Sequence, residues 1–110
     1  MSYEIVALPE FSKNLKRISK KYKQVKKDIL TLVDELKTNP KAGVQLANNC
    51  YKIRLANSSV LTGKSGGFRV IYYYLDNQNN IYLMSIYSKS DQATIKDEKI
   101  LEILKDNNLC

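Results

Sequence analysis

The sequence predicts an α+β domain: an N-terminal strand and a helical hairpin, then an antiparallel three-strand meander and a C-terminal helix. Two observations support this. Apolar residues recur at gaps of three and four between Leu8 and Leu36, which is the period of an amphipathic helix. Beyond Cys50 the pattern changes to alternation and to runs of β-branched and aromatic residues, which favour strands. We therefore expect helices packed against one face of a mainly antiparallel sheet.

The first part of the chain contains the expected helical hairpin. Ser2 to Leu8 alternates enough for a short strand, which Pro9 ends. The helical stripe then consists of Leu8, Phe11, Leu15, Ile18, Tyr22, Val25, Ile29, Leu32 and Leu36. One long helix would fit this stripe, but a small domain packs two shorter helices more easily, so we favour a bend within Lys20 to Gln24. Pro40 and Gly43 end the helical region.

The second part of the chain contains the expected meander. Cys50 to Ala56 alternates between apolar residues and cations, Phe68 to Leu75 is a longer strand, and Ile81 to Tyr87 pairs back after a turn at Asp76 to Asn80. Thr94 and Asp97 resemble a capping box for a final helix that runs to about Asp106. The apolar face of that helix would be Ile100, Leu101, Ile103 and Leu104.

Length and composition limit the class of protein. The 110 residues fit one domain over residues 1–110, and a content of 44% hydrophobic and 26% charged residues is typical of a globular chain. No apolar run is long enough for a membrane span, and Met1 to Pro9 lacks the features of a signal peptide. We therefore expect a cytoplasmic protein with no membrane partner. Cys50 and Cys110 are then expected to be free thiols.

Charge and missing residue types limit the chemistry. The net charge of +7 favours a polyanionic partner. The chain has no histidine, so any acid–base chemistry must use Lys, Arg, Tyr, Asp or Glu. Carboxylates are scattered, without the cluster that a two-metal nuclease needs. We expect neither a metal nor another cofactor.

The glycine-rich segment Thr62 to Phe68 is not a nucleotide-binding P-loop. Counting back from Gly63, Lys64 and Ser65 places Ser58 where the first glycine of that motif should be. A strand follows the segment, whereas a P-loop opens a helix. The segment is therefore expected to be a loop that carries one lysine.

The cations of the predicted strands form a candidate site. Lys52 and Arg54 are two residues apart and share one sheet face, Arg69 lies on the neighbouring strand, and Lys64 and Lys89 lie in loops at strand ends. Like charges side by side are unfavourable unless an anion lies between them, and the natural anion is a phosphodiester. The alternative is that these are ordinary exposed cations of an open sheet.

Two further groups have alternative interpretations. The cations of the helical region either form its solvated face or contact nucleic acid; they are Lys13, Lys16, Arg17, Lys20, Lys21, Lys23, Lys26 and Lys27. Of Tyr72, Tyr73 and Tyr74, the middle one must face away from its neighbours. Tyr73 and Tyr87 either pack as strand tyrosines usually do or stack on a base.

Four segments together carry a family resemblance. These are NPKAG at Asn39, CYKIRLANS at Cys50, GKSGGFRVIYYY at Gly63 and IYLMSIYSKSD at Ile81. With the helical hairpin before them, they make nearly the whole chain resemble the RelE/HigB-like toxins of bacterial type II toxin–antitoxin systems. The resemblance implies an endonuclease that cleaves mRNA in the A site of the 70S ribosome, beside 16S rRNA. It also implies a cognate antitoxin that neutralises the toxin.

The resemblance also implies roles for the strand cations. Residues matching Lys52, Arg54, Arg69 and Lys89 surround the scissile phosphate in this family, and Lys64 belongs to a loop motif of the HigB-like branch. Cleavage by the 2′-hydroxyl needs no metal, but it needs stabilised transition-state charge and two proton transfers. We expect Lys52 or Lys89 to take part in proton transfer. Arg54 and Arg69 would hold the phosphate, because guanidinium keeps its proton.

One departure leaves a role open. Some family members carry a tyrosine before the last helix, where this chain has Gln92 to Ile95 without one. Either Asp91 or Tyr87 supplies the missing group, or the lysines carry more of the chemistry. Two other functions also stay open: a ParE-like poison of DNA gyrase, which shares the fold, and a degenerate toxin that only binds its antitoxin.

Overall fold

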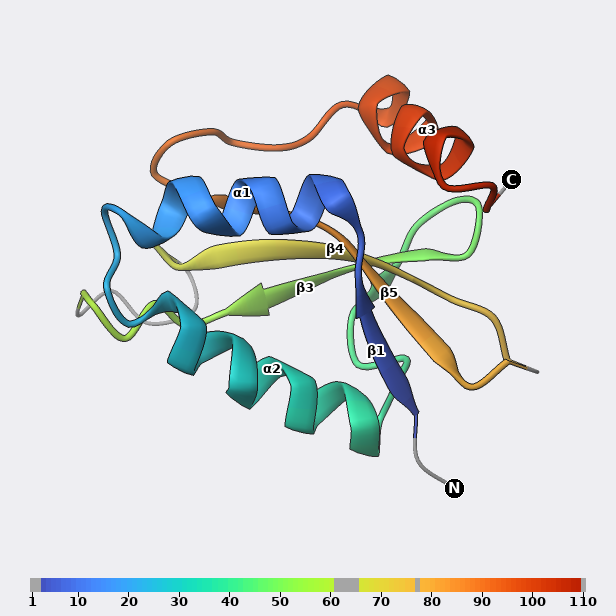
Figure 1. The fold of residues 1–110 in the computed structure, drawn as a ribbon, viewed down its shortest axis with the longest axis horizontal. Coiled ribbons are helices and arrows are strands. Elements are labelled where there is room, and N and C mark those ends of the chain that lie inside the picture. The colour runs from blue at the N-terminus through green and yellow to red at the C-terminus, as the bar shows by residue number, and fades with distance from the viewer. Residues whose placement is uncertain (1–2, 61–65, 77, 110) are drawn as a thin grey trace.

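The computed structural model describes residues 3–60, 66–76 and 78–109, and it confirms the predicted α+β class. Figure 1 shows the elements β1 (Glu4–Ala7), α1 (Pro9–Ser19), α2 (Val25–Thr38), β2 (Val44–Gln45), β3 (Cys50–Leu55), β4 (Phe68–Tyr74), β5 (Asn80–Ser88) and α3 (Asp97–Asp106). The predicted bend is confirmed, because α1 ends at Ser19 and α2 begins at Val25.

The five strands form one sheet in the order β1-β5-β4-β3-β2. Strands β3, β4 and β5 are the predicted antiparallel meander, and β1 joins it in parallel beside β5. The sequence interpretation missed β2, which pairs antiparallel with β3 and places Val44 opposite Lys52. A strand of two residues is too short to show any period in the sequence.

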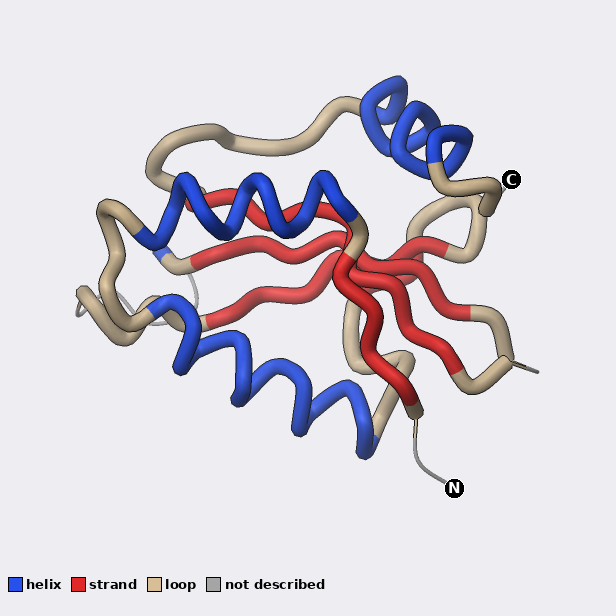
Figure 2. Tube along the Cα trace, viewed as in Figure 1, coloured by secondary structure: helices blue, strands red, loops and turns tan. Residues whose placement is uncertain are grey.

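Helices cover both faces of the sheet, so the prediction that they share one face is wrong for α3. Helices α1 and α2 pack over a cluster that includes Ile53, Val70 and Tyr72. Helix α3 packs over the opposite face, where Ile100, Ile103 and Leu104 meet Cys50, Ile71, Tyr73 and Met84. Figure 2 shows the long loop that leads from β5 to α3. The physical reason is that this second face is apolar where α3 lies, so it too must be covered.

The predicted capping box of α3 is also wrong. The N-cap residue is Lys96, without a side-chain cap, and the Thr94 hydroxyl donates instead to the backbone oxygen of Ile95 at 3.5 Å. Asp97 and Glu98 lie in the first turn, where their negative charges favour the positive end of the helix dipole. The start of α3 is therefore favoured by charge and has no side-chain cap.

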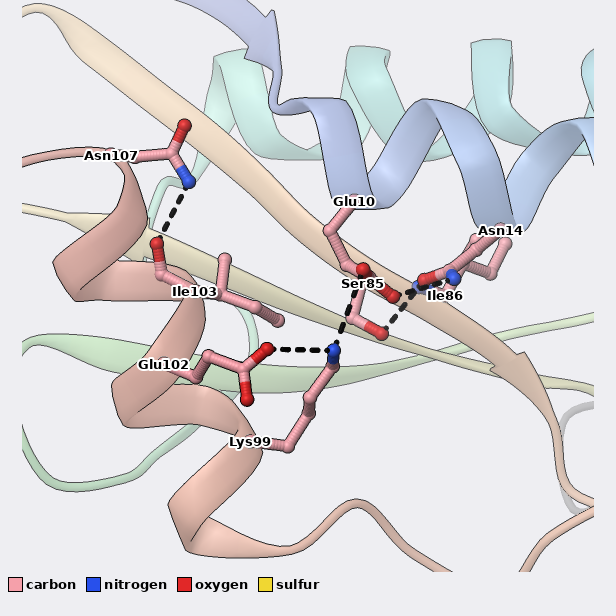
Figure 3. Close-up of polar contacts among 8 residues, drawn as sticks. All are labelled: Glu10, Asn14, Ser85, Ile86, Lys99, Glu102, Ile103 and Asn107. Carbon is pink, nitrogen blue, oxygen red and sulfur yellow. Dashed lines mark hydrogen bonds and ion pairs between the residues drawn. The ribbon is translucent and has the colours of Figure 1, made fainter.

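Asn14 of α1 completes the edge of β5 beyond the end of β1. Strand β1 pairs only with Asn80 to Leu83. Further along, Asn14 Oδ1 accepts hydrogen bonds from Ser85 Oγ at 3.0 Å and from the Ile86 backbone N at 3.2 Å. Figure 3 shows these bonds together with the chain of contacts that links α1 to α3 through Glu10, Lys99 and Glu102.

Candidate functional site

A groove of about 330 Å³ brings four of the predicted cations together. We call it the cationic groove; its lining residues are Val44, Leu46, Lys52, Arg54, Arg69, Tyr87, Lys89 and Ala93. It lies on the sheet face that α3 covers in part. Helix α3 packs over Cys50, Ile71 and Tyr73. The next row of residues, toward the C-terminal end of β3, lies outside this cluster and lines the groove.

That next row consists of Arg54, Arg69 and Tyr87, which are direct neighbours across three strands. Arg54 is paired with Arg69 between β3 and β4, and Arg69 is paired with Tyr87 between β4 and β5. Arg54 is exposed, whereas Arg69 is only 5% exposed and donates from Nη1 to the Phe68 backbone oxygen at 3.2 Å. Arginines at paired positions of neighbouring strands bring like charges close together, and an anion bound between them removes this cost.

Tyr87 contributes a buried hydroxyl to the same row. The side chain is only 2% exposed, and within the described residues its Oη has no hydrogen-bond partner. Buried hydroxyl groups normally do have a partner, so this one calls for a physical explanation. The groove therefore combines positive charge with an unused hydrogen-bond donor.

The loop that carries Lys89 is fastened at its base and along its length. The Lys89 backbone N donates a hydrogen bond to the Gly67 oxygen at 3.0 Å. This bond fixes the backbone of Lys89, while its side chain is exposed. Nearby, Ser90 Oγ lies 2.8 Å from Ser88 Oγ and 3.4 Å from Tyr22 Oη. Hydrogen bonds with Ser90 and Ser88 lower the pKa of Tyr22. The turn between α1 and α2 thus supports the loop beside the groove.

Asp91 does not line the groove. Its carboxylate pairs with Lys21 at 3.3 Å, and both side chains are more than half exposed. Of the two residues proposed to replace the absent family tyrosine, only Tyr87 lies in the cationic groove.

A hydrogen-bonded loop holds the β2 wall of the groove. Tyr72 Oη donates to the Pro40 oxygen at 2.8 Å and accepts from the Gly43 N at 3.0 Å. Burial raises the pKa of Tyr72 to about 12. A Cβ on Gly43 would lie 2.8 Å from the Lys52 oxygen, so a side chain there would push β2 away from β3. Packing thus explains the glycine of the Asn39 to Gly43 motif.

Gly67 explains part of the glycine-rich segment. A Cβ at this residue would lie 2.3 Å from the Leu55 oxygen, which no side chain allows without moving the backbone. The glycine therefore permits the backbone just before β4 to approach the end of β3, next to Arg54 and Arg69. Lys64 lies outside the described residues.

The remaining predicted residues lie away from the groove. Tyr73 faces away from Tyr72 and Tyr74, as predicted, but it is 6% exposed, belongs to the cluster under α3 and packs against Tyr82. The helical cations are all exposed and none of them lines the groove; they are Lys13, Lys16, Arg17, Lys20, Lys21, Lys23, Lys26 and Lys27.

Within the described ranges, every helix is too short or too polar to span a bilayer. No group of three or more acidic or cysteine side chains in those ranges could hold a metal ion.

The fold matches that of solved RelE toxin structures. The structure of an Escherichia coli RelE toxin with two arginines replaced by alanine, in the free state, matches with a TM-score of 0.60. The identity is 20%, over 96% of this chain and 98% of that one. A similar RelE variant in complex with a peptide of the antitoxin RelBc matches with a TM-score of 0.54, at 23% identity over 93% and 94% of the chains.

The family follows from the sequence itself. Residues 5–93 match the family described as the ParE toxin of the type II toxin–antitoxin system parDE. The chain therefore belongs to the ParE toxin family, within the RelE/ParE superfamily, and it is the toxin component of a type II toxin–antitoxin system.

Proposed function

We propose that this toxin is a ribosome-dependent endonuclease that cleaves mRNA in the ribosomal A site. The observation that carries the proposal is the cationic groove, in which Lys52, Arg54, Arg69 and Lys89 line one cavity. Four cations around one cavity fit the charge of a phosphodiester and of its more negative transition state. A protein that acted only by contact with an enzyme surface would not need this arrangement.

The positions of the cations support different roles. Arg69 is buried and fixed, so it sets the position of the phosphate. The exposed Arg54, which is paired with Arg69 across the strands, contacts the phosphate from the other side. In the reaction, the 2′-oxygen bonds to phosphorus as the bond to the 5′-oxygen breaks. One group accepts the 2′-hydroxyl proton and another supplies a proton to the leaving oxygen. Lys52 and Lys89 are the groove residues that we assign to these transfers.

The proposed partners follow from the same function. They are a cognate antitoxin, the 70S ribosome with its 16S rRNA, and mRNA, all in the cytoplasm. The exposed cations of α1, of the following turn and of the start of α2 flank the end of the sheet where Tyr22 packs against Phe68. We assign these cations to contacts with ribosomal RNA, which add affinity without chemistry.

A second candidate function is supported by the family match. The matching family is named for ParE, and the ParE-like alternative from the sequence is a poison of DNA gyrase. This function would leave the cationic groove without a role in chemistry. A third candidate, a degenerate toxin that only binds its antitoxin, would not arrest growth.

Brief expression without the antitoxin, followed by mapping of new mRNA 5′ ends, tests the proposal. We expect cuts confined to translated frames, and we expect Arg69→Ala to abolish them. Lys105→Ala, which removes an exposed cation of α3 outside the groove, is the matched control and should cut normally. Growth arrest without cuts, together with inhibition of gyrase supercoiling by the purified protein, would reject the nuclease in favour of the gyrase poison. Normal growth would indicate a degenerate toxin.

A further inference from the structure

Among the described groove residues, Tyr87 is the one whose side chain leaves a buried polar atom without a hydrogen bond. Its Oη is buried and has no hydrogen-bond partner within the described residues, although the ring lies directly beside Arg69 across β4 and β5. A buried donor without an acceptor destabilises the free protein. A donor of this kind is explained if a ligand supplies the acceptor.

The groove determines the chemistry of that acceptor. Lys52, Arg54, Arg69 and Lys89 line the same cavity, so the ligand there carries negative charge. A hydrogen bond from a neutral hydroxyl to an anionic oxygen is short and strong. Among the described residues that line the groove, the four cations and the Tyr87 hydroxyl are all hydrogen-bond donors, and together they suit one anion.

We infer that Tyr87 Oη donates a hydrogen bond to a non-bridging phosphate oxygen of the RNA held in the cationic groove. The inference rests on the proposed function of the groove as a phosphodiester site. In this role Tyr87 transfers no proton. Its role is to fix one phosphate oxygen from a rigid strand, whereas the lysines reach the phosphate on long, flexible side chains.

The burial of Tyr87 distinguishes this role from base stacking. With 2% of the side chain exposed, the ring offers no free face to a base, so the phenol contributes through its hydroxyl. The cations that share the groove with Tyr87 can turn onto a phosphate held at Oη. Arg54 and Lys89 are exposed and Lys52 is half-buried, so these side chains reorient at little cost in packing.

Titration of the full chain with uridine 3′-monophosphate at low ionic strength tests the inference, with NMR chemical shifts as the readout. We expect Tyr87→Phe to weaken binding about tenfold, the loss typical of one hydrogen bond to a charged group. The Tm of the unliganded variant should be equal to or above that of the wild type, because the deleted hydroxyl has no partner among the described residues. Tyr82→Phe is the control, since Tyr82 lies on the same strand outside the groove and should bind normally.

Three results would overturn the inference. Tyr87→Phe could bind the nucleotide as tightly as the wild type, or Tyr82→Phe could lose as much affinity. A Tm several degrees lower for unliganded Tyr87→Phe would show that the hydroxyl already has a partner. Failure of the proposed function gives a different result: no mRNA is cut in cells, while the loss of phosphate affinity in Tyr87→Phe persists.

Discussion

Arg54 and Arg69 lie directly opposite each other on β3 and β4, in the row that Tyr87 completes on β5. Cross-strand neighbours of like charge reduce stability. Here the two guanidinium groups also share the cationic groove with two lysines. The arrangement is unfavourable for the free protein and favourable for a bound phosphate, so function and stability should respond differently to mutation at this pair.

Arg54→Ala should separate these two effects. The free energy of unfolding should be unchanged or rise by about 0.5 kcal/mol, because a repulsive cross-strand neighbour is removed. Cleavage of ribosome-bound mRNA should fall at least about tenfold, because a charge-assisted hydrogen bond to phosphate is lost. Urea denaturation and a purified translation assay measure the two quantities. Cleavage at the wild-type rate would show that Arg54 does not hold the phosphate.

Asn14→Ala should destabilise the domain by about 2 to 3 kcal/mol. The variant leaves Ser85 Oγ and the Ile86 backbone N without their acceptor at a buried sheet edge, and each unsatisfied donor costs about 1 to 3 kcal/mol. Lys13→Ala, on the exposed side of the same helix, should change stability by less than about 0.5 kcal/mol. Urea denaturation of both variants measures the contrast, and equal effects would contradict the role of Asn14.

The raised pKa of Tyr72 predicts that the protein loses stability at alkaline pH. Burial raises its pKa to about 12 in the folded state, so the unfolded chain loses this proton first, near pH 10. Stability should therefore fall between pH 10 and 12, by at most about 3 kcal/mol from this residue.

Tyr74 contributes in the same pH window, because its hydrogen bond with Tyr3 and its burial raise its pKa to about 12. Tyr72→Phe should thus reduce the alkaline loss without abolishing it, as measured by guanidinium denaturation at pH 9 to 12. The same slope in both proteins would show that Tyr72 ionises normally.

Gly67→Ala should disrupt the site more than Gly43→Ala. The added Cβ would lie 2.3 Å from the Leu55 oxygen in the first variant and 2.8 Å from the Lys52 oxygen in the second, and both contacts are with backbone. We expect several kcal/mol of destabilisation for Gly67→Ala, of the order seen for severe overpacking. Circular dichroism and thermal denaturation measure this order. A fully stable Gly67→Ala protein would show that β3 and β4 can separate there freely.

Asp91→Asn should have little effect. The ion pair with Lys21 is exposed, and such pairs contribute about 0.2 to 1 kcal/mol. Asp91 does not line the cationic groove, so mRNA cleavage should stay close to the wild-type rate. A loss of cleavage with unchanged stability would return Asp91 to the list of candidate acid–base groups.

Much of this protein was determined by local sequence patterns. The 3.5-residue period predicted both helices of the hairpin, and alternation in Cys50 to Ala56 placed Lys52 and Arg54 on the face opposite the apolar core. These predictions succeed because the direction of a side chain follows from its neighbours in a helix or strand. The motifs also indicated the superfamily, because each of them is a contiguous stretch of the sequence.

Only the tertiary structure decided the rest, because it depends on residues far apart in sequence. It placed α3 on the second face of the sheet, added β2 beside Lys52, and used Asn14 to complete the edge of β5. It also placed Asp91 outside the cationic groove and buried the Tyr87 hydroxyl where no other described residue offers it a hydrogen bond. Whether a polar group is buried or paired depends on what packs over it, and no local period encodes that.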